Sequence, residues 1–424
     1  MEREGVVFKN NFDLFSSLLN FTVLVVLISE AFKVIPATEG WFTELTLNKN
    51  IIQIFLNDEI LLPPLYPLFI NIINKFSHQL IILRLIGIAF GFLLYEQTSI
   101  TIKRGLEILL EEKRNLPIFK ISKIFGALLI FYIINISSYL IWYDFTILVL
   151  IFQLLILNLA LYAIKSNHQQ KSKFYNFAGI LLILGIFLKH SNMGIYFVFM
   201  QFSFLGIALA SKHERIYIYN LFKWQIIAAL LIFISLNIYI FLDKNYSIYN
   251  FLDASLNAKG GALIVGKFIL NGFNHIFNEI KKFEVIFMGL CIYAYFKNLK
   301  IRGLNFIFIY NFLWSYFMIK GFYNLSGFSV QAISILVICN LFYCFERLIL
   351  NLRRLKNLRK EKIFLFIFLY TSSSLGCLIG NFTSAGVVYN GYYIGLIIGI
   401  ILQICFLYES LSYLNKKFIN LRNL

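Results

Sequence analysis

Six residues of this apolar chain have the types needed for acid–base chemistry on a phosphate-bearing substrate. In chain order they are Glu39, Asp58, Glu59, Arg84, Asp144 and Lys189. A carboxylate beside a substrate hydroxyl can take its proton as a general base. Arginine and lysine pair strongly with phosphate oxygens. A site that combines these groups would suit the transfer of a sugar from a lipid phosphate.

The elements that must position these residues are membrane-spanning helices. The chain has 424 residues, of which 59% are hydrophobic and only 14% are charged. Apolar runs of 18 residues or more recur along it, and each is long enough to cross a bilayer. We therefore predict an all-α polytopic membrane protein of about 12 transmembrane helices. They span 15–36, 79–101, 121–142, 145–164, 174–189, 192–211, 222–242, 284–297, 303–319, 326–345, 363–380 and 389–410.

The placement of lysine and arginine predicts the orientation of these helices. Most of the 38 basic residues fall between alternate helices, which puts both termini on the cytoplasmic side of an inner membrane. The net charge of +17 then points to the anionic cytoplasmic leaflet as partner rather than to nucleic acid. The basic run at 346–362, ERLILNLRRLKNLRKEK, is interpreted in the same way.

This orientation leaves two long loops outside. In the first, 37–78, two apolar segments too short to span, 51–62 and 65–76, flank a Pro-Pro pair and predict two juxtamembrane helices in the interface plane. The second, 243–283, predicts another interfacial helix or a lid. We expect one integral membrane domain, 1–424, and no soluble domain.

Each candidate residue also has a simpler interpretation. Asp144 suits a helix N-cap, and Glu39 beside Trp41 suits a solvated acid at the membrane surface. Lys189 can extend to the headgroups. Asp58 and Glu59 are adjacent, so only one of them can point to a given site. The five cysteines lie in or beside apolar runs without metal-ligand spacing, which favours buried packing.

The order of six short motifs resembles the GT-C class of membrane glycosyltransferases, near the bacterial protein-mannosyltransferase-like and aminoarabinose-transferase-like branches. The motifs are EGW (39–41), ND (57–58), PPLYPL (63–68), LRL (83–85), WYD (142–144) and LKHSN (188–192). They cover about the first half of the chain. This sequence departs from common versions of the pattern by having Glu39 where aspartate is frequent.

The resemblance implies an outer active site and a sugar donor on a polyprenyl phosphate. Glu39 would be the general base, with Asp144 supporting an envelope acceptor or a cation, and the reaction would invert the sugar. Lys189 and Arg84 would bind the donor phosphate. Asp58, Glu59 and Tyr66 would contact the substrate or a metal ion. A divalent cation, Mg²⁺ or Mn²⁺, is compatible with this site, although the sequence does not require one.

Three other functions remain open at this stage. A transporter or lipid-saccharide flippase would show repeated halves and polar residues at the bilayer midplane. The segment TSSSLGCLIG (371–380) is either a packing surface or a broken helix of that kind. An O-antigen-polymerase-like enzyme would use the 243–283 loop. A non-catalytic scaffold would need none of the six residues.

Overall fold

The structure, a computed structural model, describes residues 2–33, 80–110, 117–136, 145–188, 190–242, 262–298, 316, 325–349, 358–382 and 389–422. Every regular element within these residues is an α-helix. In chain order the helices are α1 (Glu2–Lys33), α5 (Leu80–Leu110), α6 (Ile118–Ile136), α7 (Phe145–Lys165), α8 (His168–Leu188), α9 (His190–Ala210), α10 (Lys212–Leu242), α12 (Ala262–Ile280), α13 (Phe283–Asn298), α15 (Leu325–Ile349), α16 (Leu358–Phe382) and α17 (Tyr389–Arg422).

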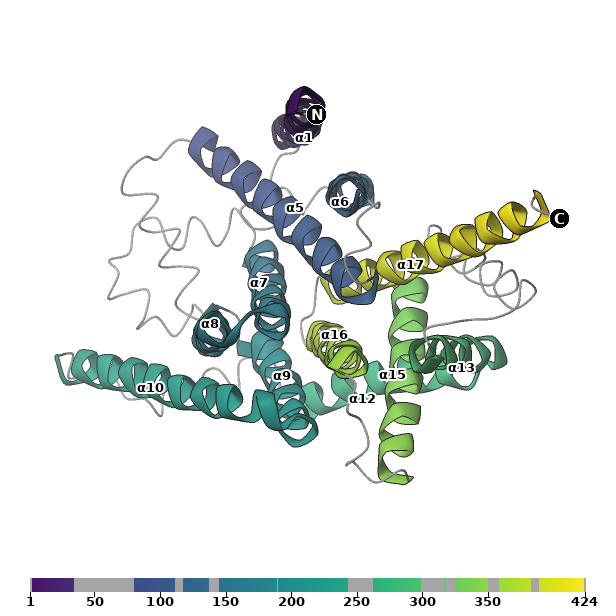
Figure 1. The fold of residues 1–424 in the computed structure, drawn as a ribbon. Coiled ribbons are helices and arrows are strands. Elements are labelled where there is room, and N and C mark those ends of the chain that lie inside the picture. The colour runs from purple at the N-terminus through teal and green to yellow at the C-terminus, as the bar shows by residue number, and fades with distance from the viewer. Residues whose placement is uncertain are drawn as a thin grey trace.

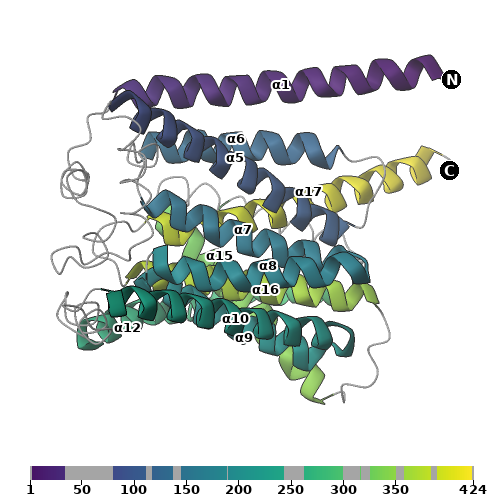
Figure 2. The ribbon, with the colours of Figure 1, turned by 90° about the vertical axis from the view of Figure 1, so that its left-hand side faces the viewer.

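The fold is a helical bundle of the kind that crosses a membrane several times. Within the described ranges, nine helices are long and apolar enough to span a bilayer. They run side by side between two ends, and both chain termini lie at the same end (Figures 1 and 2). The prediction of a multi-pass, all-helical membrane protein is therefore confirmed.

The predicted helices agree with the observed ones in position, but two parts of the prediction cannot be compared. The predicted helix 303–319 lies outside the described residues, apart from Tyr316, and so do the predicted juxtamembrane helices of the 37–78 loop. The 243–283 region contains a helix, α12, in its described part. It lies across the end of the bundle opposite the termini (Figure 2) and packs against α15 and α16.

Several helices extend beyond their apolar spans. α10 begins at Lys212, about ten residues before the predicted start, because its polar first turns find partners in the bundle. The Glu214 side chain, 6% exposed, forms an ion pair with Lys171 of α8 and accepts a hydrogen bond from the Tyr175 hydroxyl at 3.0 Å. Hydropathy marks only the membrane-thick part of such a helix, so it predicts the start too late.

Two glycines allow α16 to approach α9 closely. An ideal Cβ placed on Gly380 would lie 3.0 Å from the backbone oxygen of Asn192, and one on Gly376 would lie 3.1 Å from the Cα of Tyr196. Small residues four apart let membrane helices come into backbone contact. α16 is continuous through 371–380. The segment TSSSLGCLIG is therefore a packing surface and not a broken helix.

The same spacing recurs on α17, where Gly395 and Gly399 face α15. A Cβ on Gly395 would lie 3.2 Å from the backbone oxygen of Ser329, and one on Gly399 would overlap the ring of Phe328. The Ser329 hydroxyl donates a hydrogen bond of 2.7 Å to the Tyr392 carbonyl. These contacts fix which helix faces are buried, since apolar side chains alone do not distinguish a neighbouring helix from lipid.

Peripheral helices expose apolar side chains, as expected for a surface that meets lipid. In Figure 1, α1 and α10 lie at the edge of the bundle. Their exposed large apolar side chains are Leu14, Leu18, Phe21, Leu24, Val25, Ile28, Phe32, Ile216, Tyr219, Trp224, Ile226, Leu230, Leu231, Phe233 and Ile234. A lipid bilayer environment accounts for this exposure, because hydrocarbon tails are as apolar as these residues.

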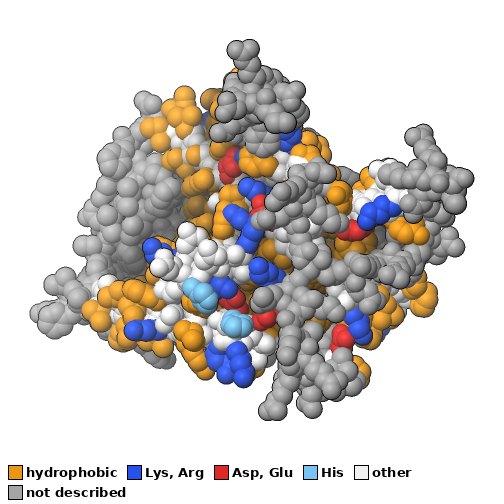
Figure 3. All heavy atoms as spheres, in the orientation of Figure 1, with side chains coloured by type: hydrophobic (Ala, Val, Ile, Leu, Met, Phe, Trp, Pro, Cys, Tyr) orange, Lys and Arg blue, Asp and Glu red, His pale blue; other side chains and the backbone are white. Residues whose placement is uncertain are grey.

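We call the end of the bundle that holds both termini the basic end. Figure 3 looks at it directly and shows Lys, Arg, acidic and His side chains gathered near its middle. It includes Lys103, Arg104, Lys120, Lys123, Lys165, Lys171, Lys173, Lys212, Arg215 and Lys416. The opposite end, among residues whose side chains are described, has Arg84, Lys267, Lys281 and Lys282.

Candidate functional site

Of the predicted site residues, only Arg84 can be described. Glu39, Asp58, Glu59, Tyr66, Asp144 and Lys189 lie outside the described residues. The positions assigned to the acceptor, the base and a metal ion therefore stay predictions. The structure does describe the helix ends nearest in sequence to four of the predicted residues, which are Glu39, Arg84, Asp144 and Lys189.

Those helix ends lie at the end of the bundle opposite the basic end. α1 ends at Lys33, six residues before Glu39, and α7 begins directly after Asp144. Lys189 stands between the last residue of α8 and the first of α9. Arg84 is in the second turn of α5, which begins at this same end (Figure 2). The described ends of α1, α5, α7, α8 and α9 that are nearest to these positions in the sequence therefore lie at one end of the bundle.

Among the described residues, Arg84 has an aromatic neighbour and no anionic partner. Its guanidinium carbon lies 5.2 Å from the centroid of the Phe32 ring of α1, an arrangement in which the ring face attracts the positive charge. Its Nε atom is buried and has no hydrogen-bond acceptor within the described part of the chain. Because a buried donor without a partner is costly, an incoming phosphate or carboxylate oxygen would stabilise this arginine.

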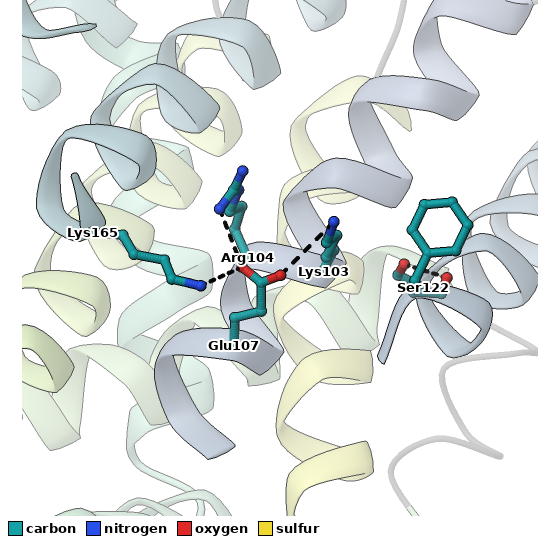
Figure 4. A network of polar contacts seen from close by, with 6 residues as sticks. Lys103, Arg104, Glu107, Ser122 and Lys165 are labelled. Atoms are coloured by element: carbon teal, nitrogen blue, oxygen red, sulfur yellow. Dashed lines mark hydrogen bonds and ion pairs between the residues drawn. The ribbon is translucent and has the colours of Figure 1, made fainter. Parts of the chain in front are cut away.

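The basic end holds a second group of charges, centred on Glu107 of α5 (Figure 4). One carboxylate oxygen lies 3.1 Å from Arg104 Nη1 and 3.0 Å from Lys165 Nζ, and the other lies 3.9 Å from Lys103 Nζ. The Arg104 guanidinium stacks over the Tyr162 ring of α7, 3.5 Å from its centroid. One acid is therefore shared by three cations from α5 and α7.

Two further ion pairs join neighbouring helices, each with at least one largely buried side chain, and the sequence reasoning missed both. Lys123 of α6, with 7% of its side chain exposed, pairs with Glu96 of α5 and lies 4.7 Å from the centroid of the Tyr95 ring. The other is the pair of Lys171 and Glu214. A charged residue within an apolar helix is expensive unless paired. If this rule had been applied to Glu96 and Lys123, it would have predicted that the two side chains form an ion pair between α5 and α6.

Neutral polar side chains form a third set, buried between α5, α7, α9, α16 and α17. The hydroxyls of Thr98 and Tyr393 lie 2.7 Å apart, and Thr101 donates a hydrogen bond of 3.0 Å to the Asn158 side-chain oxygen. The Tyr196 hydroxyl lies 2.9 Å from Ser373 Oγ. Such bonds between neighbouring helices stabilise a bundle and fix its register.

No group of three or more His, Cys, Asp or Glu residues that could hold a metal ion is found within the described ranges. The acids predicted to bridge a divalent cation, Glu39 and Asp144, lie outside those ranges. Comparison with protein-family models, with curated proteins and with solved structures finds no match to this chain.

Proposed function

We propose that this chain is a membrane glycosyltransferase that moves a sugar from a polyprenyl-phosphate donor to an acceptor of the cell envelope. The order of the six sequence motifs supports this function. The structural observation that carries it is Arg84, a partly buried cation at the end of the bundle where α1 ends and α7 and α9 begin. Within the described part of the chain, its Nε donor has no acceptor. A donor phosphate is the ligand that such an arginine fits best.

In the proposed reaction, Glu39 takes the proton of the acceptor hydroxyl while the acceptor oxygen attacks the anomeric carbon of the sugar. The bond from that carbon to the phosphate oxygen breaks, and the polyprenyl phosphate leaves with the bonding electrons. Arg84 and Lys189 bind the negative charge that grows on the phosphate, where exclusion of water strengthens the attraction. Asp144 holds the acceptor. Attack from the face opposite the phosphate inverts the configuration of the sugar.

The acids are tested by replacing each carboxylate with its amide. Glu39→Gln and Asp144→Asn should each lower transfer from a polyprenyl-phosphate sugar, by about 10²–10⁴-fold for the base, with membrane expression unchanged. Glu284→Gln is the matched control, because Glu284 is an exposed acid in the first turn of α13 at the same end of the bundle. Full activity in both site variants would refute the assignment.

The role of Arg84 is tested in the same transfer assay. Arg84→Gln should raise the KM for the lipid-linked donor and lower kcat, because it removes a contact that strengthens as phosphate charge grows. Lys267→Gln removes the same charge from an exposed position of α12 and should change neither. If Arg84→Gln and Lys267→Gln behave alike, Arg84 does not bind the donor.

We further propose that the basic end faces the cytoplasm and that the transfer site opens on the outer side of the inner membrane. The concentration of lysine and arginine at the basic end supports this orientation. Single cysteines introduced near residues 58 and 356 into a cysteine-free variant test it. A membrane-impermeant maleimide applied to intact cells should label only the first. Labelling of the second alone would reverse the topology.

The acceptor and the sugar can be identified by mass spectrometry of envelope glycolipids from cells with and without the protein. A transferase predicts loss of one sugar mass from a specific acceptor and accumulation of its lipid-linked donor. If the protein were a flippase, cells without it would instead keep that donor on the cytoplasmic leaflet. The purified protein would then show no sugar transfer. The purified-protein assay therefore separates these two functions.

A further inference from the structure

The helix α12 differs from the spanning helices in its direction. It lies across the end of the bundle opposite the basic end, whereas the spanning helices run along the bundle (Figures 1 and 2). Within the described ranges, it is not one of the nine helices that are long and apolar enough to cross a membrane. The sequence leaves two interpretations of this segment open, a helix in the membrane surface and a lid in water. The depth of α12 in the bundle distinguishes between them.

Contacts with two spanning helices give this depth. The Ser334 hydroxyl of α15 donates a hydrogen bond of 3.4 Å to the Ile276 carbonyl, and Ser334 is seven residues past Gly327, where the apolar span of α15 begins. The ring of Phe273 lies 6.5 Å from the ring of Phe199 in α9, measured between centroids. Phe199 is likewise seven residues past the first residue of its span. At about 1.5 Å per residue, both contacts lie no more than roughly 10 Å inside this end of the spans.

The position of α13, which follows α12 after a two-residue turn, agrees with this depth. α13 runs beside α15, where Cys339 Sγ donates to the Gly289 carbonyl at 3.1 Å. Near its end, Lys297 pairs at 3.0 Å with Glu346, the last residue of the α15 span. Because α13 has 16 residues and that span has 20, α13 begins inside the span. The end of α12 joined to it is at the same level, and helices in the membrane surface bury their apolar side about 5–10 Å deep.

The exposed side chains of α12 divide by type around the helix. Leu270 (62% exposed) and Phe277 (56%) are seven residues apart and share one flank, and Phe283 (79%) continues this apolar surface beyond the turn. Gly272 and Ile276 face the bundle. A helix with an apolar flank beside a polar one fits a boundary between hydrocarbon and water. The other exposed residues described on α12 and in the turn are polar or charged: Lys267, Asn271, Asn274, His275, Asn278, Lys281 and Lys282.

We propose that α12 is embedded in the lipid surface and that its partner is the bilayer. Leu270, Phe277 and Phe283 lie among the acyl chains. Lys267 and Lys281 extend to the headgroups, since a lysine can keep its stem in apolar surroundings and its charge in water. The proposal uses no residue of the proposed transfer site, so it does not depend on the enzymatic function.

The first test measures which solvent reaches each flank of α12. Phe277→Cys and Asn278→Cys are made singly in a cysteine-free variant of the full chain, spin-labelled and reconstituted into phosphatidylcholine vesicles. The label at 277 should collide with oxygen, which concentrates among acyl chains, and should be shielded from a water-soluble nickel chelate. The label at 278 should collide mainly with the chelate. Phe202→Cys is the reference for deep lipid, because Phe202 is 65% exposed in the middle of the α9 span.

The ratio of oxygen to chelate collisions should therefore fall in the order Phe202→Cys, Phe277→Cys, Asn278→Cys. A second test keeps the native cysteines, in case the cysteine-free variant does not fold. Benzoylphenylalanine is incorporated in place of Phe277 or Asn278, the membranes are irradiated, and the products are identified by mass spectrometry. Phospholipid adducts should form at 277 and be several-fold fewer at 278.

Three results would overturn the proposal. Equal chelate contact at 277 and 278 would place α12 in water, as a lid. Shielding of 277 from both oxygen and chelate, with photoproducts that join it to peptides of this chain, would mean that another part of the protein covers the flank. Equal ratios for Phe277→Cys and Phe202→Cys would place α12 in the hydrocarbon core instead of the lipid surface.

Discussion

The contact between α9 and α16 gives a sharp prediction for the substitution Gly380→Ala. The added methyl group would lie 3.0 Å from the backbone oxygen of Asn192 and 3.3 Å from its Cα. Both atoms belong to the backbone of a packed helix, so neither can rotate away as a side chain would. Gly194→Ala is the matched control, because Gly194 lies on α9 itself and a Cβ there meets nothing within 4 Å.

The two substitutions share one contribution to stability and differ in another. Replacing glycine by alanine inside a helix stabilises it by about 1 kcal/mol in both variants. Overpacking a close contact costs about 1–3 kcal/mol, and only Gly380→Ala has that cost. Gly194→Ala should therefore be more stable than the unchanged protein. Gly380→Ala should be less stable than Gly194→Ala by about 1–3 kcal/mol, since the helix contribution cancels in the comparison.

Reversible unfolding of the purified protein in mixed detergent micelles measures this difference, with helix content followed by circular dichroism. The comparison of variants is more reliable than either absolute value, because both refer to the same unfolded state. Equal stability of Gly380→Ala and Gly194→Ala would show that α9 and α16 do not approach through Gly380. The fold would then need a different pairing of these two helices.

Three further predictions follow from burial. Glu214→Gln should lower the free energy of unfolding by about 3–5 kcal/mol, because it leaves the Lys171 ammonium, 13% exposed, without its partner. Lys282→Gln should change the free energy of unfolding by no more than about 1 kcal/mol, since Lys282 is 43% exposed in its pair with Glu279. Equal losses of stability in Glu214→Gln and Lys282→Gln would contradict the role of burial. In the folded protein, the partly buried Cys344 should react with a membrane-permeant maleimide before the buried thiols do. Mass spectrometry of peptides from the labelled protein would show this order. The buried thiols are Cys291, Cys339, Cys377 and Cys405.

The sequence predicted the helices well because membrane-spanning segments have few alternatives. Every backbone amide inside hydrocarbon must be paired within the chain, so a long apolar run has to be a helix. The predictions were less accurate where helices leave the apolar layer, as at Lys212, because polar turns continue only if tertiary partners exist. α12 was harder still to assign, since an amphipathic segment is compatible with an interfacial helix, a lid or a loop.

The candidate site was predicted from the sequence to a smaller extent. Residue types suggested a phosphate-binding cation at Arg84, and that role stays a prediction, although no acceptor for its Nε is found among the described residues. The cluster at Glu107 was not predicted, although its three cations are visible in the sequence as basic residues of the positive-inside pattern. Nothing in their spacing indicates that Lys165, on α7, shares a carboxylate with Arg104 on α5.

The amino-acid sequence is enough to identify a multi-pass helical membrane protein with its basic residues concentrated at one end. Apolar length and charge placement suffice for this, because the bilayer acts as a uniform solvent along the whole chain. Which helices are in contact is seen only in the folded protein. Lipid and protein interior are almost equally apolar, so hydropathy cannot distinguish a face that meets lipid from one that meets a helix. Close approach at glycines such as Gly380, and ion pairs such as that of Lys123 and Glu96, determine which helix faces are in contact.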